Sequence, residues 1–255
     1  MADSLQGAAR SEPEGVYTVS NTQRGQRVLY LDAHLDRLED SARREGFPLK
    51  LERQRLRRAL RSMLDEAGFQ EMRFRLCVPR LAPDQILITI EAWSALPQPL
   101  YLDGVRCATA KGLRRRNPAS KGSAWLQQRG RFTVPSGCYE ALLLAADGRI
   151  LEGLGSNFYG VLDGQLRTAR TDVLAGITRG IVLQLAPDIL PVKLSALLLD
   201  DLPRVEEAFL SSSSRGLVSV KRVDEQVIGS GRPGPVTLAL VEAFERFVEQ
   251  HLEAL

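Results

Sequence analysis

The chain has 255 residues, with 34 basic and 31 acidic side chains and a formal net charge of +3. This balance argues against a protein that binds nucleic acid through bulk charge alone. An apolar fraction of 44% is enough to form a buried core, which excludes a disordered chain.

The cysteine and histidine contents narrow the function classes further. Cys77, Cys107 and Cys138 lack the spacing of metal ligands, and His34 and His251 are the only two histidines. We therefore expect reduced thiols in a cytoplasmic protein, and no metal site. No apolar run approaches the roughly 18 residues needed to cross a bilayer, so no membrane segment is expected.

The first part of the chain shows the pattern of an α+β domain. Residues 1–14 are small and polar, and we expect them to be a disordered leader. In chain order, the predicted elements are strands at 15–22 and 27–31, helices at 32–47 and 53–69, and strands at 72–79 and 84–93. Asp32 is the expected N-cap of the first helix and Gly46 its expected stop.

The second part mixes short strands with helices and predicts a separate domain. The Pro-rich segment 96–104 is the expected hinge, and we place the domains at 15–110 and 121–255, joined by a loop at 111–120. The predicted helices are at 119–132, at 178–187 and from Pro235 onward, and the predicted strands are at 139–145, 149–153, 157–164, 165–169, 207–214 and 217–224.

Several segments, taken in order, resemble the class IV aminotransferases, which are fold-type IV enzymes that use pyridoxal 5′-phosphate (PLP). The matching segments are "HLDRLEDSA", the lysine of "NPASKGSAW", "EALLLAADGRILEGLGSNFYGVLDGQLRTA", "VLAGITR", "EEAFLSSSSRGLVSV" and "VDEQVIGSGRPGPVT". The resemblance covers nearly everything from Gly15 onward. It implies a small N-terminal α/β sandwich domain and a larger C-terminal α/β domain built as a pseudo-barrel.

The resemblance also implies which residues carry the chemistry. Lys121, among small residues, matches the lysine that forms a Schiff base with PLP and then moves the substrate's α-proton. Lys111 is the other lysine in this window, but its flanking glycine and arginines suit a solvated loop. Glu152 matches the acid that keeps the pyridine nitrogen protonated, so that the ring withdraws electrons.

The remaining cofactor ligands follow from the same match. Gly176 and the amides of Ile177 and Thr178 in "LAGITR" resemble a phosphate-binding helix start. Ser212, Ser213 and Arg37 are expected to add donors to the phosphate. Leu174 is expected to pack on the ring, Asn157 to organise the site without reacting, and His34 to be structural.

The substrate side departs from the family pattern. Tyr17 matches a tyrosine that holds a substrate carboxylate in D-amino-acid aminotransferase, but that enzyme's arginine and histidine after the third strand are missing from "VPRLAPDQ". Trp125 stands next to the position that a tyrosine occupies in the branched-chain enzymes. The cluster Arg114 to Arg116 is either a carboxylate ligand, with Arg116 as the candidate, or a solvated turn.

Three functions remain open at this point. The first is an aminotransferase acting on an amino acid and a 2-oxo acid. The second is a lyase of the aminodeoxychorismate type, which releases 4-aminobenzoate and pyruvate. The third is a cofactor-binding protein without turnover, or a nucleic-acid binder using the Arg-rich helix. The family resemblance also implies a homodimer, with no nucleic acid or membrane as partner.

Overall fold

The computed structural model describes residues 4–255, and contacts within the chain divide it into two compact units. The first unit contains the chain up to Ser94, residues 117–131 and residues 248–255, and the second contains residues 95–116 and 132–247. This division differs from the predicted one. Residues 105–110 belong to the second unit, because they pair with strands of that unit, whereas Lys121 belongs to the first.

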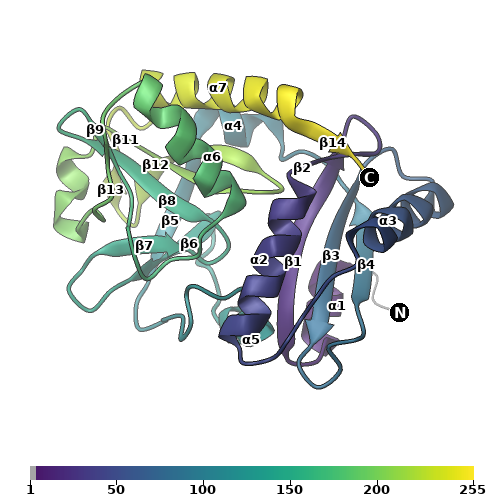
Figure 1. Cartoon of the computed structure of the whole chain (residues 1–255). Coiled ribbons are helices and arrows are strands. Elements are labelled where there is room, and N and C mark those ends of the chain that lie inside the picture. The colour runs from purple at the N-terminus through teal and green to yellow at the C-terminus, as the bar shows by residue number, and fades with distance from the viewer. Residues whose placement is uncertain (1–3) are drawn as a thin grey trace. The chain divides into compact units, whose positions relative to one another are not determined.

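The first unit is built on a five-stranded antiparallel sheet (Figure 1). Its strands, in spatial order, are β14 (Leu252–Ala254), β2 (Arg27–Leu29), β1 (Gly15–Gln23), β3 (Met72–Pro79) and β4 (Leu87–Ala92). The predicted hairpin and the order of two strands, two helices and two strands are confirmed. The last strand is supplied by the C-terminus, which returns to pair with β2.

Alternating side chains give this sheet two different faces. Val16, Phe74 and Leu76 point into a core that also contains leucines of α2 (Leu31–Arg44) and α3 (Arg53–Ala67). Tyr17 and Cys77, which are direct partners across β1 and β3, belong to the opposite face. There they pack with residues of α1 (Leu5–Ser11) and α5 (Ser123–Gly130).

Helix α1 shows that the prediction of a disordered leader is wrong for residues 4–14, while residues 1–3 lie outside the described part of the chain. The helix is too short to be stable alone, so tertiary contacts must hold it. Leu5 and Ala8 are buried, and the Leu5 amide donates to Glu91 Oε2 at 2.9 Å.

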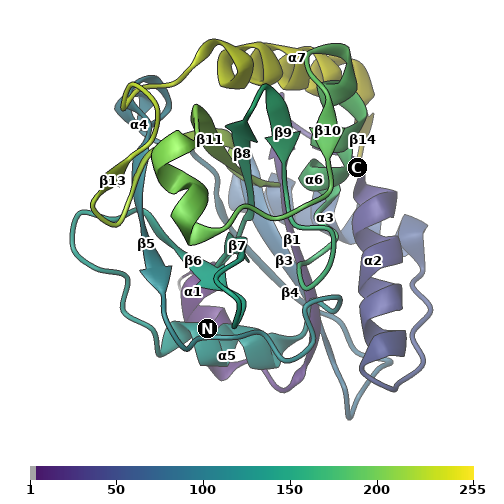
Figure 2. The ribbon, with the colours of Figure 1, turned by 90° about the vertical axis from the view of Figure 1, so that its left-hand side faces the viewer.

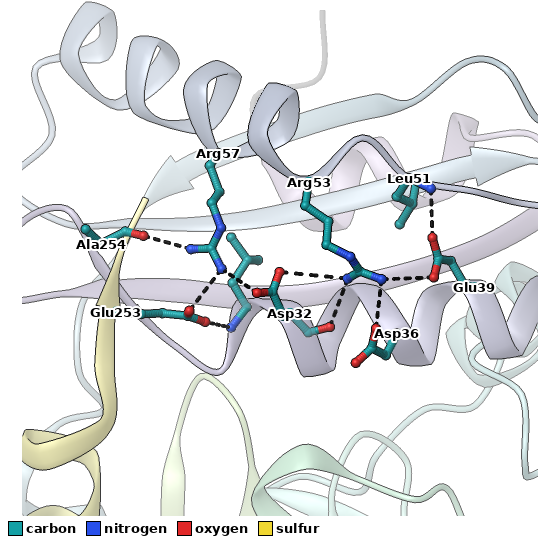
Figure 3. A network of polar contacts seen from close by, with 9 residues as sticks. Asp32, Asp36, Glu39, Leu51, Arg53, Arg57, Glu253 and Ala254 are labelled. Carbon is teal, nitrogen blue, oxygen red and sulfur yellow. Dashed lines mark hydrogen bonds and ion pairs between the residues drawn. The ribbon is translucent and has the colours of Figure 1, made fainter.

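The predicted N-cap of α2 is also wrong, and Figure 3 shows what replaces it. The helix starts at Leu31, whose amide donates to Glu253 Oε1 at 2.6 Å, so a carboxylate from β14 satisfies this free helical amide. Asp32 lies in the first turn, where its carboxylate pairs with Arg57 at 3.1 Å. Arg57 also donates to the Ala254 carbonyl and to Glu253.

This network bears on the hypothesis of a nucleic-acid-binding helix. Arg53 of α3 contacts Asp32, Asp36 and Glu39, and Arg57 contacts Asp32 and Glu253 (Figure 3). These two arginines are therefore paired with carboxylates of the first unit itself. The helix is held to α2 and β14 by them, which gives the arginine-rich run a structural role.

The second unit contains a closed ring of strands (Figure 2). In spatial order the ring is β8 (Asn157–Leu162), β11 (Glu207–Ser212), β12 (Gly216–Val223), β5 (Val105–Ala110), β6 (Glu140–Leu144) and β7 (Ile150–Gly153), and β7 pairs back to β8. This closed, barrel-like sheet confirms the predicted α+β fold with a pseudo-barrel domain. Three short strands extend it: β9 (Gln165–Arg167), β10 (Val192–Lys193) and β13 (Gln226–Val227).

The helices of the second unit include α4 (Gln98–Asp103), which occupies the predicted hinge, and α6 (Ile177–Leu185). Helix α7 (Pro235–His251) belongs to this unit up to Phe247, and its last residues belong to the first unit. Helix α7 begins where Glu207 accepts the amides of Val236 and Thr237 at 3.0 and 2.7 Å. Gly234 is required there, because a Cβ would lie 2.2 Å from the Glu207 carboxyl carbon. None of the helices in residues 4–255 is long and apolar enough to cross a membrane.

Candidate active site

The candidate residues fall into two groups, one in each unit. The first unit holds Tyr17, His34, Arg37, Lys121 and Trp125. The second unit holds Arg116, Glu152, Asn157, Leu174, Gly176, Ile177, Thr178, Ser212 and Ser213. Lys111 is exposed in a turn of the second unit, as expected for a solvated loop residue.

Glu152 is a buried carboxylate fixed by three donors. It lies near the end of β7 with 2% of its surface exposed. Its Oε2 accepts the Leu174 amide at 2.9 Å and the Asn157 side-chain amide at 3.3 Å, and its Oε1 accepts Arg115 Nη1 at 3.0 Å. A buried carboxylate needs such partners to stay ionised.

Asn157 links this carboxylate to the loop before α6. Its Nδ2 also donates to the Leu174 carbonyl at 2.9 Å, so one side chain ties β7, β8 and the loop together. This supports the organising role predicted for Asn157. Gly176 lies close to Asn157, and a Cβ added at Gly176 would be only 2.3 Å from Asn157 Oδ1. Any larger residue would push the start of α6 away from Glu152.

The start of α6 offers backbone donors. Gly176 is the N-cap in an extended conformation and no side chain caps the helix. The first amides of an α-helix have no partner within the helix and attract anions. Those of Ile177 and Thr178 are the amides predicted to bind phosphate, and Thr178 is only 3% exposed.

The turn between β11 and β12 carries the predicted serines. Ser212 Oγ accepts Arg215 Nε at 3.0 Å, and Ser213 is partly exposed in the turn. Arg215 also donates to Tyr139 and to the Gly155 carbonyl, and it lies 3.4 Å from Glu140. These contacts fix the turn beside the loop that follows Glu152. Sequence reasoning missed Arg215 and Glu140, although both lie inside the matching segments.

In the arginine cluster before Lys121, the side chains of Arg115 and Arg116 differ in exposure. Arg116 is exposed in its loop, whereas the side chain of its neighbour Arg115 is 7% exposed and paired with Glu152. The inward-facing arginine of this cluster therefore binds a carboxylate of the protein itself. A run of three arginines gives no sequence signal as to which of them turns inward.

In the first unit, one face of α2 meets the segment that carries Lys121. His34, Arg37 and Ser41 are spaced so that they share a helix face. The Lys121 amide donates to Ser41 Oγ at 3.1 Å, and the Lys121 carbonyl accepts the Tyr17 amide at 3.0 Å. Lys121 is thus anchored through its backbone to both α2 and β1.

His34 is a neutral, buried histidine. It is 1% exposed and its Nδ1 lies 3.0 Å from Thr18 Oγ1. Arg37 Nη2 lies 3.2 Å from the same hydroxyl and 3.5 Å from Nδ1, which makes Nδ1 an acceptor. Burial, followed by the charges of Arg37 and Lys121, holds the pKa of His34 well below its usual value. These contacts agree with the structural role predicted for His34, which also lies beside Arg37.

Tyr17 lies between charged groups on the other face of the same sheet. The guanidinium carbon of Arg75 is 4.2 Å from the centre of the Tyr17 ring, and Lys121 Nζ is 5.3 Å from it. Arg75 is 3% exposed and was not predicted. The alternation in "MRFRLCVP" could have signalled it, because it puts Arg75 opposite the core residues Phe74 and Leu76. Trp125 is buried on α5, and its role stays a prediction.

The family described as "Amino-transferase class IV" matches residues 15–223. The chain belongs to this family.

Two relatives and one solved structure illustrate the match. A Thermotoga maritima protein with the provisional name branched-chain-amino-acid aminotransferase is 33% identical over 84% of this chain and 80% of its own. A D-alanine aminotransferase from Bacillus licheniformis is 29% identical, over 92% of this chain and 88% of its own. A branched-chain amino acid aminotransferase from T.th., solved with pyridoxamine 5′-phosphate, has a TM-score of 0.81, 23% identity and coverage of 98% and 92%.

These findings identify the chain as an enzyme of the aminotransferase type and confirm the predicted fold. They do not favour the lyase alternative, since the relatives carry aminotransferase names. Class IV aminotransferases depend on PLP. The residues of this chain suit that group: a fixed buried carboxylate, a helix start with free amides and a glycine that no other residue can replace.

Proposed function

We propose that this aminotransferase uses PLP bound covalently to Lys121 and moves an amino group between an amino acid and a 2-oxo acid. The observation that carries the proposal is the environment of Glu152. A carboxylate with 2% exposure is held by three donors and is joined through Leu174 and Asn157 to the start of α6. This arrangement suits a cofactor with a basic ring nitrogen and a phosphate.

The cofactor supplies an electron sink for the carbanion that forms when the α-proton leaves. Glu152 would hold a proton at the pyridine nitrogen, and the Arg115 charge would keep the carboxylate ionised. Lys121 would carry the α-proton from one carbon to the other as base and then acid, which requires a neutral amine.

Backbone amides, side-chain hydroxyls and one arginine would hold the phosphate. The amides of Ile177 and Thr178 and the Thr178 hydroxyl are donors at the start of α6, and Ser212 and Ser213 add hydroxyls. Arg37 would supply the positive charge. Leu174 would pack on the ring with its side chain, while its backbone holds Glu152.

The substrate contacts belong to the proposal as well. Tyr17 and Trp125 would line the substrate side. Arg116 would contact substrate only from its loop, and Arg115 is already engaged. The names of the relatives support branched-chain amino acids and D-alanine as the first donors to test. A homodimer in the cytoplasm, carried over from the family resemblance, completes the proposal.

An amino-donor screen tests this function. The purified protein is loaded with PLP and mixed with L- and D-forms of alanine, valine, leucine and glutamate, and the absorbance of the cofactor is followed. We expect at least one donor to bleach the bound cofactor, and a 2-oxo acid to restore it. A Lys121→Ala variant should do neither. Failure of every donor, with bound cofactor present, would contradict the proposal.

A further inference from the structure

Ser41 of α2 is a buried hydroxyl that two residues of the proposed chemistry share. It is 0% exposed. Its Oγ donates to the Arg37 carbonyl at 2.7 Å, one turn earlier in the helix, and accepts the Lys121 amide at 3.1 Å. A hydroxyl has a single hydrogen to donate. Because the helix takes that hydrogen, the oxygen is left to act as the acceptor for Lys121.

The side chain of Arg37 is held at its other end by β1. Arg37 Nη2 donates to Thr18 Oγ1 at 3.2 Å, and Thr18 is 0% exposed. Arg37 is thus fixed at its guanidinium by Thr18 and at its carbonyl by Ser41. The position of its charge is therefore set relative to the Ser41 hydroxyl.

The segment that carries Lys121 is fastened to the same face of α2. Asn117 Nδ2 donates to Glu45 Oε1 at 3.0 Å, and a Cβ added at Gly122 would lie 3.3 Å from that oxygen. Glu45 follows Ser41 by one helical turn, so both residues lie on one side of the helix. The contact made by the Lys121 amide itself is the one with Ser41, which places this hydroxyl between Lys121 and Arg37.

We propose that Ser41 is a positioning residue that sets the separation between two attachment points of the cofactor, the amine of Lys121 and the charge of Arg37. This inference rests on the proposed function. When two groups hold one ligand, the second contact strengthens binding only if its geometry suits the first. Ser41 acts through the backbone of both residues, so its removal should weaken their joint action more than either contact alone.

The test compares three ligands on the full chain freed of cofactor. Pyridoxal can use the amine, inorganic phosphate can use the charge, and PLP uses both. Kd is measured for each ligand with the wild type and with Ser41→Ala. We expect the Kd of PLP to rise about tenfold or more, and those of pyridoxal and phosphate to change by less than about threefold. Alanine favours a helix more than serine does, so α2 itself should be preserved.

Thr22→Val is the matched control for the loss of a buried hydroxyl. Thr22 is also 0% exposed, and its Oγ1 accepts the Met72 amide at 2.8 Å within the same unit. This variant should keep all three Kd values within about threefold of the wild type, although it too leaves a buried amide without an acceptor. A joint rise of all three Kd values in Ser41→Ala would show a general structural role and overturn the inference, as would an unchanged Kd of PLP.

Amide hydrogen exchange in the wild type needs no variant and no turnover, so it keeps the test decisive if Ser41→Ala fails to fold. Inorganic phosphate bound at Arg37 should steady the Ser41 hydroxyl and slow exchange of the Lys121 amide by about fivefold or more. The Met72 amide, which Thr22 accepts, is the internal control and should exchange at the same rate with and without phosphate. No slowing at Lys121 would overturn the inference.

Failure of this inference and failure of the proposed function give different results. A wild type in which PLP attaches to another lysine would contradict the proposed function, and the inference would fall with it. Attachment to Lys121 in both proteins, with the same Kd of PLP, would contradict the inference alone.

Discussion

At the scale of single residues, each unit contains a buried ionisable side chain that is fixed by its neighbours. Glu152 is a carboxylate held by three donors, and His34 is an imidazole whose pKa is lowered by burial and by nearby positive charge. Each is tuned by a neighbouring arginine, Arg115 in one unit and Arg37 in the other.

The first prediction concerns the charge of Glu152. In Glu152→Gln the side chain keeps its size, but the pyridine nitrogen of PLP loses its anionic partner. One carboxylate oxygen is also replaced by an amide donor, which faces the Leu174 amide or Arg115. We expect kcat to fall by about 100-fold, the scale of losing one strong electrostatic contact, while PLP still attaches to Lys121. The control is Glu225→Gln, since that side chain is 89% exposed. A kcat within threefold of the wild type would contradict the role given to Glu152.

The second prediction concerns pH and His34. Because the pKa of His34 is lowered in the folded protein, only the unfolded chain takes up its proton as pH falls below about 6.5. This proton uptake removes up to about 1.4 kcal/mol of stability per pH unit below that value and nothing above it. Urea unfolding at pH 7.5, 6.5 and 5.5 measures it. We expect His34→Gln to lose about 1 kcal/mol less than the wild type between pH 6.5 and 5.5. A wild-type slope in His34→Gln would refute the assignment.

At the scale of elements, sequence periodicity predicts the fold well. It does not predict contacts between residues that are far apart in the chain. The alternation of β1 and β3 and the leucine spacing of α2 and α3 gave these elements to within a few residues, because side-chain periodicity is local. Helix α1 was missed, because Leu5 and Ala8 are too few to signal an amphipathic helix, and Glu91, which binds its first amide, lies 86 residues away.

The site was predictable where motifs are contiguous and unpredictable where partners are distant. Glu152, Asn157 and Gly176 sit in matching segments, and their mutual contacts agree with the roles expected of them. The pairing of Glu12 with Arg75 joins two segments that are far apart in the chain, and no periodicity announces it. The inward turn of Arg115 in place of Arg116 is equally invisible in a run of arginines.

The third prediction tests the network that fixes α3. Arg57 is 11% exposed and contacts Asp32, Glu253 and the Ala254 carbonyl. Losing one partner of a buried pair costs about 3–5 kcal/mol, but the two carboxylates here are 52% and 36% exposed, so we expect Arg57→Leu to lower the unfolding free energy by about 2 kcal/mol. Arg58→Leu, at an exposed position of the same helix, should change it by less than about 0.5 kcal/mol. Equal effects of the two variants would show that the network contributes nothing.

At the scale of the whole molecule, the first unit is assembled from three separate pieces of the chain. Residues 117–131 bring Lys121 to β1, and residues 248–255 bring β14 to β2. The predicted division at 110 and 121 followed the order of the sequence. The order of the sequence does not reveal that β5 pairs with β12 and β6, or that the C-terminus returns to pair with β2.

The fourth prediction follows from this return. Removing residues 252–255 deletes β14, the buried side chains of Leu252 and Leu255, and the carboxylate that holds the Leu31 amide. Each buried leucine contributes about 2 kcal/mol, so we expect a loss of up to about 4 kcal/mol and a lower melting temperature in calorimetry. A truncated protein that melts with the full chain would show that the C-terminal strand is dispensable.

Labelling of the bound cofactor tests directly whether Lys121 carries it. The PLP-loaded protein is reduced with borohydride, digested, and analysed by mass spectrometry for the labelled peptide. Our account predicts that the phosphopyridoxyl group is attached to Lys121 and that Lys121→Arg remains unlabelled. A label on Lys111 or on any other lysine, or no label at all on a protein saturated with PLP, would contradict it.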